Sequence, residues 1–178
     1  MVEIDTFEDL KARGDSAFKD KLFGEALDAY DAALSLVDDA DERRPAVLFN
    51  RGAAYYHLSR FAESVKSCTH AIELKPDYVK ALYRRAMAYS KLDQVDEAAA
   101  DFDRIFEIDP TLRLQHKAEY EEIKKRLNTK MESEKEKMIS DLKDLGNSLL
   151  GHFGMSLNDF KKDPVTGSYT LSSRNPSQ

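Results

Sequence analysis

The 178-residue sequence has no tryptophan, one cysteine, 7 glycines and 5 prolines. So few glycines and prolines, with a charged fraction of 34%, favour long solvated helices over strands, which need more turns. The single Cys68 cannot form an internal disulfide bond. No apolar run approaches the roughly 18 residues of a membrane-spanning helix, and residues 1–10 lack the basic start and apolar core of an export signal. We therefore expect a helical protein in the cytoplasm with no membrane span.

The charge balance limits the kinds of partner that the chain can bind. A formal net charge of -6 disfavours nonspecific binding to nucleic acid or to an anionic membrane, although a local basic patch can exist within an acidic chain. The hydrophobic fraction of 42% is enough for the core of one helical domain. We expect protein partners and no nucleic acid.

An internal repeat is the most informative feature of the sequence. Residues 48–55 (LFNRGAAY) align with residues 82–89 (LYRRAMAY), and residues 71–76 (AIELKP) align with residues 105–110 (IFEIDP), both after a shift of 34 positions. An earlier copy begins at residues 10–14 (LKARG) and precedes the second copy by 38 positions. The sequence therefore contains three copies of the repeat, at about residues 7–38, 45–77 and 79–111.

Each copy has the pattern of two helices joined by a tight turn, since its apolar and small residues recur at spacings of three or four. The four extra residues of the first copy fall in Asp38–Arg44, where a loop tolerates insertion. Pro76 and Pro110 are expected to end the second helix of their copies. Thr6 followed by Asp9 predicts a capping box at the start of the first helix. Small residues are expected where paired helices approach closely, at Gly14, Gly52, Ala86, Ala26, Ser64 and Ala98.

This pattern resembles the tetratricopeptide repeat family over about residues 7–111. The resemblance implies an all-α fold: a right-handed superhelix of three helix pairs, in which the first helix of each pair lines a concave groove for extended peptides. A long C-terminal capping helix (residues 112–150) and a partly disordered tail (residues 151–178) are expected to follow.

The capping segment contains one glycine, no proline and apolar residues at spacings of three, four or seven. Covering the third repeat is its expected role, while a break near residues 133–135 and a coiled-coil contact are the alternatives. The tail has turn signals but also apolar side chains, so part of it is expected to dock on the capping helix or on a partner. Segments within residues 142–169 also resemble the C-terminal part of the tetratricopeptide repeat protein 1 family.

Five polar positions are expected to meet in the groove. Residues four apart lie on one face of a helix, which pairs Lys11 with Asp15 and Lys80 with Arg84, while Asn50 occupies the middle repeat. Three cations and an amide suit carboxylates, because Arg offers a planar fork, Lys a point charge and Asn an amide donor. The sequence therefore predicts a carboxylate-binding groove.

This arrangement resembles the dicarboxylate clamp of chaperone-binding tetratricopeptide domains, which grips the C-terminal Asp of Hsp90 and Hsp70. The resemblance implies a co-chaperone adaptor whose four matching positions bind such a peptide. Asp15 departs from the pattern, in which an Asn amide donates to the terminal carboxylate, because an ionised Asp only accepts hydrogen bonds. Three alternatives remain open: Asp15 pairs with Lys11 or Lys19, it is protonated when the ligand binds, or the groove prefers another ligand.

Two further residues are candidates for contacts beside the groove. Tyr56 and Met87 are possible contacts of an apolar pocket beside the groove, with packing between helices as the alternative role of each. The histidines show no metal-ligand spacing with each other or with Cys68, and no phosphate-binding loop or catalytic constellation is present, so we expect no metal, no cofactor and no enzyme. The alternative function is a scaffold of the same fold that uses the groove or the protruding helix to bind another protein, such as a signalling GTPase, with a vestigial clamp. In the adaptor, the capping helix and tail are expected to recruit or position a further protein.

Overall fold

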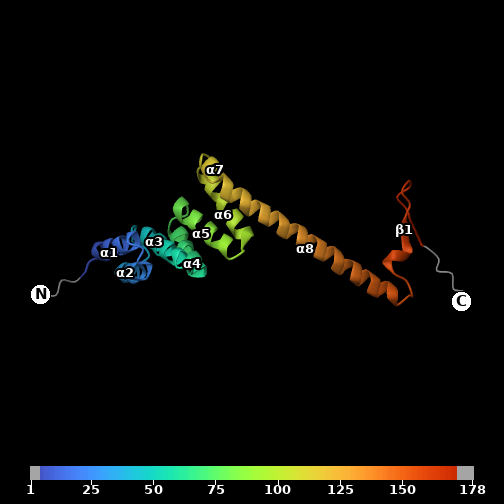
Figure 1. The fold of residues 1–178 in the computed structure, drawn as a ribbon, viewed down its shortest axis with the longest axis horizontal. Coiled ribbons are helices and arrows are strands. Elements are labelled where there is room, and N and C mark those ends of the chain that lie inside the picture. The colour runs from blue at the N-terminus through green and yellow to red at the C-terminus, as the bar shows by residue number, and fades with distance from the viewer. Residues whose placement is uncertain (1–4, 172–178) are drawn as a thin grey trace. The chain divides into compact units, whose positions relative to one another are not determined.

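The computed structural model describes residues 5–171 and divides between Leu127 and Asn128 into two compact units. The first unit is a stack of paired helices (Figure 1). Its pairs are α1 (Phe7–Lys19) with α2 (Phe23–Ser35), α3 (Arg44–His57) with α4 (Phe61–Leu74), and α5 (Val79–Lys91) with α6 (Val95–Ile108). Each pair contacts the next, α2 against α3 and α4 against α5, and α3 also contacts α1 and α5. The predicted all-α stack of three helix pairs is confirmed.

The predicted helix ends are found in the structure. The side chain of Thr6 accepts a hydrogen bond from the Asp9 N–H, and the Asp9 side chain accepts one from the Thr6 N–H, which completes the capping box. Helices α4 and α6 end two residues before Pro76 and Pro110. The loop between α2 and α3 contains the inserted residues.

The turn within each pair has the same backbone conformation in all three repeats. Lys21, Ser59 and Asp93 have φ angles of 62°, 58° and 61°, the left-handed region that favours glycine. The N–H of Lys21 donates to the carbonyl of Phe18, and the N–H of Leu22 donates to that of Ala17. These bonds form a Schellman motif, which satisfies the last carbonyls of the first helix and reverses the chain.

Small residues allow the paired helices to approach each other closely. A Cβ atom added to Gly14 would lie 2.5 Å from the Tyr30 ring, and one added to Gly52 would lie 2.7 Å from the Sγ atom of Cys68. The other four predicted contact positions are fully buried: Ala26, Ser64, Ala86 and Ala98. This part of the prediction is confirmed.

Gly14→Ala is expected to lower the free energy of unfolding by about 1–3 kcal/mol, because the new methyl group overlaps the Tyr30 ring. Gly24→Ala is the matched control, since its Cβ would meet nothing within 4 Å. That variant should be unchanged or up to about 1 kcal/mol more stable. Urea denaturation followed by circular dichroism measures both, and equal stability of the two variants would contradict the close packing.

The third repeat is covered by two helices where the sequence predicted one. Helix α7 (Leu112–Gln115) is a single turn, and α8 (Lys117–Gly151) begins after His116, whose φ and ψ angles are -105° and 21°. The His116 ring packs on Tyr83 with ring centroids 4.5 Å apart, which holds the chain in this bend. Ile123 on α8 is 2% exposed and joins the core of the third repeat. The capping role of this segment is therefore present, with the break at His116 and none at residues 133–135.

The second unit contains the rest of α8 and the described part of the tail. Leu157 packs against Gly146 of α8, and its N–H donates to the Asn147 side chain at 2.7 Å. The tail thus docks on its own helix, as predicted. A row of apolar side chains on α8 stays more than half exposed: Met131, Met138, Leu142, Leu145 and Leu149.

The tail has more regular structure than the sequence predicted. A short 3-10 helix, η1 (Leu157–Asp159), precedes an antiparallel hairpin of β1 (Phe160–Lys162) and β2 (Tyr169–Leu171). The Asp163 carboxylate accepts hydrogen bonds from the N–H groups of Val165 and Thr166, which form the turn and lower the pKa of Asp163. Pro164 and Gly167, two of the residues that suggested an irregular chain, therefore belong to a hairpin turn. Residues 172–178 of the predicted tail lie outside the described residues.

Candidate functional site

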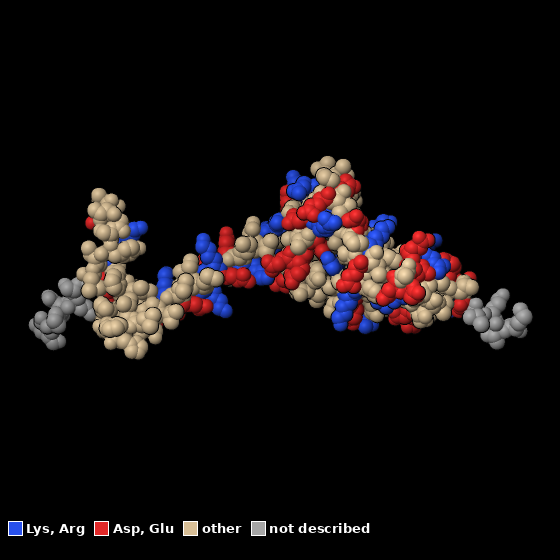
Figure 2. Space-filling view, turned by 180° about the vertical axis from the view of Figure 1, so that it is seen from behind, with Lys and Arg blue, Asp and Glu red and all other residues tan. Residues whose placement is uncertain are grey.

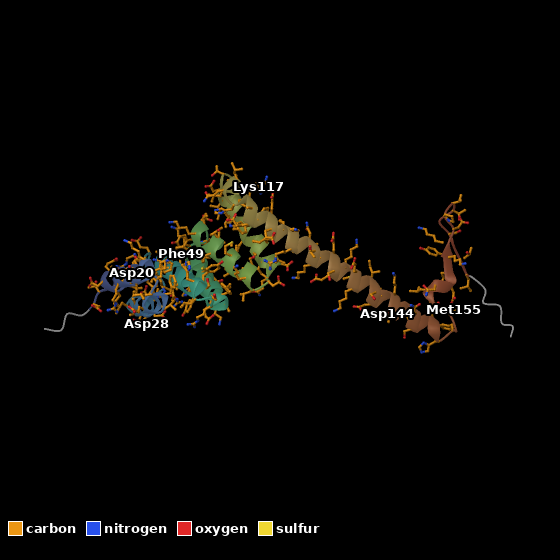
Figure 3. All side chains as sticks on the ribbon, in the orientation of Figure 1. Asp20, Asp28, Phe49, Lys117, Asp144 and Met155 are labelled. Carbon is orange, nitrogen blue, oxygen red and sulfur yellow. The ribbon has the colours of Figure 1, made fainter. Side chains whose placement is uncertain are left out.

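The first helices of the three pairs line two adjoining cavities, which we call the groove. The inner cavity has a volume of about 240 Å³ and is lined by Asp15, Phe18, Tyr30, Phe49, Asn50, Ala53 and Arg84. The outer cavity has a volume of about 570 Å³ and is lined by Phe49, Val79, Lys80, Tyr83, Arg84, Asp109, Leu112, Gln115 and His116. Phe49, labelled in Figure 3, and Arg84 belong to both. The groove therefore runs from α1 across α3 to α5 and α7.

Asp15 is the most highly coordinated side chain of the inner cavity. Lys11 Nζ lies 2.7 Å from its Oδ2 atom, and Asn50 Nδ2 donates to its Oδ1 atom at 2.9 Å. The carboxylate thus engages two of the predicted carboxylate-binding residues. Of the three alternatives for Asp15, the structure has the pairing with Lys11.

Tyr30 is a member of the site that is not among the predicted groove residues. Its ring is 1% exposed, and its hydroxyl donates to Asp15 Oδ1 at 2.8 Å. Burial, followed by this hydrogen bond to a carboxylate, raises the pKa of Tyr30 above its usual range, so the hydroxyl stays protonated as a donor. The helical spacing of residues places Tyr30 on a packing face of its helix, but it does not give the direction of the hydroxyl.

Arg84 lies where the two cavities meet. Its guanidinium stacks over the Tyr56 ring at 4.8 Å from the centroid, and its Nε atom is buried without a hydrogen-bond partner among residues 5–171. A buried donor without a partner carries a desolvation cost that an incoming acceptor would remove. Arg84 therefore places a positive charge in the groove and carries a donor that no described residue satisfies.

Lys80 and the aromatic pair of Tyr83 and His116 shape the outer cavity. Lys80 is exposed, one helical turn from Arg84 on the same face of α5. Burial is the largest cause that raises the pKa of Tyr83, whose hydroxyl contacts Glu119. The outer cavity can therefore bind a ligand that carries an apolar side chain next to a carboxylate, with Lys80 and Arg84 as the cations for the carboxylate.

The two predicted groove contacts lie beside the cavities and line neither. Tyr56 supports the guanidinium of Arg84 and packs edge-on against Phe61 at 5.3 Å. Met87 packs against the core of the third repeat. Both side chains have the packing role that the sequence analysis gave as the alternative.

The described residues hold no grouped ligands for a metal ion. Among residues 5–171, no cluster of three or more His, Cys, Asp or Glu side chains is placed to bind one. Cys68 is fully buried, and burial raises the pKa of its thiol to about 12. On the face drawn in Figure 2, Lys and Arg are interspersed with Asp and Glu. No helix within this part of the chain is long and apolar enough to cross a bilayer.

Comparison with known proteins shows that segments of this chain are similar to a family of repeats and to parts of longer proteins. The model of the Tetratricopeptide repeat family matches residues 45–78 and 79–112. RNA polymerase II-associated protein 3 of Homo sapiens is 36% identical over 101 residues, which are 57% of this chain and 15% of that protein. The matched segment is thus a small part of the curated relative.

Two solved structures match over most of their own length. The second TPR domain of human RPAP3, in complex with the HSP70 peptide SGPTIEEVD, is 31% identical with a TM-score of 0.58, over 65% of this chain and 92% of that one. The first TPR of Spaghetti (RPAP3), bound to the HSP90 peptide SRMEEVD, is 29% identical with a TM-score of 0.63, over 72% of this chain and 99% of that one. Both peptides end in Glu-Glu-Val-Asp.

Proposed function

Because this chain belongs to the tetratricopeptide repeat family, we propose that its groove binds the acidic C-terminal peptides of Hsp90 or Hsp70 and that the protein is a cytoplasmic co-chaperone adaptor. The observation that carries the proposal is Arg84, a cation in the groove whose buried Nε atom has no acceptor among the described residues. A carboxylate of the peptide would supply the negative charge that pairs with the guanidinium and an oxygen that accepts its hydrogen bond. Lys80, one turn away on α5, adds a second positive charge for an acidic peptide.

The shape of the groove supports an extended peptide with mixed chemistry. The outer cavity offers the rings of Phe49 and Tyr83 to an apolar side chain, while Lys80 and Arg84 face its carboxylates. SRMEEVD and SGPTIEEVD each place a Met or Ile directly before two Glu residues. We therefore propose that the carboxylates of the peptide bind to Lys80 and Arg84 and that the preceding apolar side chain enters the outer cavity.

Arg84→Ala is expected to weaken binding of a fluorescent SRMEEVD peptide by about 10-fold or more in an anisotropy titration at low salt. Loss of one charge-assisted hydrogen bond costs about 1.5–3 kcal/mol, which corresponds to this change in Kd. Lys80→Ala should weaken binding in the same direction, to a smaller extent because Lys80 is exposed.

Arg104→Ala is the matched control. Arg104 lies on α6, pairs with Asp77 and Glu107, and lines neither cavity. Its removal changes the net charge of the protein as the Arg84 change does, so it should leave the affinity nearly unchanged. Equal losses in the two variants, or no saturable binding by the native protein, would contradict the proposed function.

The second predicted contact of the adaptor, through α8 or the tail, stays a prediction. Five apolar side chains of α8 in the second unit are more than half exposed, which is compatible with a protein partner at that surface. The scaffold that binds a signalling GTPase remains the alternative for such a surface.

A further inference from the structure

We propose that Asp15 is a resident carboxylate ligand of the groove, which competes with a bound peptide for Lys11 and Asn50. The inference rests on the proposed function, because it concerns how the same groove selects its acidic ligand. It makes Asp15 a specificity-determining residue whose carboxylate stands where a carboxylate of the ligand would otherwise bind.

The coordination of Asp15 is that of a bound anion. Its two oxygens accept hydrogen bonds from Lys11, Tyr30 and Asn50, at 2.7, 2.8 and 2.9 Å. A carboxylate has about four lone-pair sites, so three donors nearly satisfy it. The donors come from α1, α2 and α3, so the carboxylate also joins the first repeat to the second.

Asp15 cannot leave this position without cost. The Tyr30 hydroxyl belongs to a side chain that is only 1% exposed, and it would lose its acceptor if the carboxylate rotated away. An unsatisfied buried donor of this kind destabilises the folded state. The Lys11 and Asp15 side chains are 30% and 40% exposed, so a ligand can reach the pair but must displace a contact that is partly shielded from water.

The two ends of the groove therefore differ in what they offer. At the first repeat, Lys11 and Asn50 already bind a carboxylate, and a second one would meet its negative charge. At the third repeat, Lys80 has no ion pair and the Nε atom of Arg84 no hydrogen-bond partner within residues 5–171. The native protein holds an acidic peptide mainly through α5, and the free terminal carboxylate of the peptide adds little to its affinity.

Asp15→Asn separates the charge of Asp15 from its structural contacts. The Asn side chain keeps an Oδ1 acceptor for Tyr30 and Asn50, while it releases Lys11 and removes the negative charge. We expect this variant to bind the SRMEEVD peptide about 10-fold more tightly or better than the native protein. The ratio of affinities for the free and the C-terminally amidated peptide should also rise above its native value.

Asp28→Asn is the control for a general charge effect. Asp28, labelled in Figure 3, is an exposed residue of α2 that lines neither cavity, so the same change of charge there should leave the affinity as it is. Equal affinity of the native protein and Asp15→Asn, or equal tightening by both variants, would overturn the inference. The proposed function would still stand if Arg84→Ala lost binding.

A second measurement needs no peptide. Acetylation of Lys11, compared with other lysines by mass spectrometry of the intact folded protein, should be faster in Asp15→Asn, because the amine has lost its partner. Unchanged Lys11 reactivity would overturn the inference. Faster acetylation together with tighter peptide binding by Asp15→Asn would support the inference, whereas no peptide binding in either protein would contradict the proposed function on which it rests.

Discussion

Arg85→Met is expected to lower the free energy of unfolding by about 3–5 kcal/mol. The Arg85 guanidinium forms two hydrogen bonds to the Asp101 carboxylate, at 2.6 and 2.9 Å, and a third to Thr69 at 3.1 Å. The Asp101 side chain is 7% exposed, and burial already raises its pKa although Arg85 opposes the rise. Removal of the guanidinium leaves a buried carboxylate without its partner. Urea denaturation at pH 7 measures the loss.

The preceding repeat offers a matched control, because Arg51 lies 34 positions before Arg85. Its guanidinium contacts Ser67 and Asp31, and the Asp31 side chain is 51% exposed. Arg51→Met should therefore cost about 1 kcal/mol or less. Changing Asp101 to Leu in the Arg85→Met protein should recover most of the stability, since no uncompensated charge remains. Equal losses for the two arginines would show that burial of the pair does not set the effect.

Phe102→Ala is also expected to cost about 3–5 kcal/mol. Phe102 is fully buried in α6, and its ring contacts those of Tyr83, Phe106 and Tyr120, with centroids 5.8–5.9 Å apart. These contacts join the third helix pair to α8 and support the wall of the outer cavity. Truncation removes the ring and leaves a void that neighbouring side chains fill only in part. Urea denaturation measures the loss, and a lower affinity for the SRMEEVD peptide should accompany it.

Phe153→Ala is the control for this substitution, because the same ring is removed from a residue that is 77% exposed. Its free energy of unfolding should change by about 0.5 kcal/mol or less. A loss of similar size in both variants would contradict the assignment of Phe102 to the core.

The helix pairs were predictable because their determinants are local and recur in register. Close approach of the paired helices requires a small residue, and one recurs at the equivalent position of each repeat, as Gly14, Gly52 and Ala86. The capping box at Thr6 and the helix ends before Pro76 and Pro110 depend on residues within one turn of each other. Such features leave a trace in the spacing of residues along the chain.

The groove was only partly predictable, since its contacts join residues that are distant in sequence. The pairing of Asp15 with Lys11 was one of the alternatives, because both lie on one helix face. The hydrogen bonds from Tyr30 and Asn50 span 15 and 35 residues and depend on how the helices pack. The bend at His116 likewise depends on a distant ring and has no Gly or Pro to mark it. The similarity of the whole chain to the tetratricopeptide repeat protein 1 family, which was inferred from the tail, stays a prediction.

The three turns with positive φ have the same backbone conformation but different side chains. Because Lys21, Ser59 and Asp93 share one backbone conformation without a glycine, helix packing holds the turn, and the side chain at its tip is released from any role in shaping it. Asp93 has a role of another kind: its carboxylate pairs with Arg126 and anchors the helix that follows the repeats. With the backbone of the turn held in this way, the side chain at its tip can differ from repeat to repeat, and one repeat can carry an anchor without a change in the architecture that the three share.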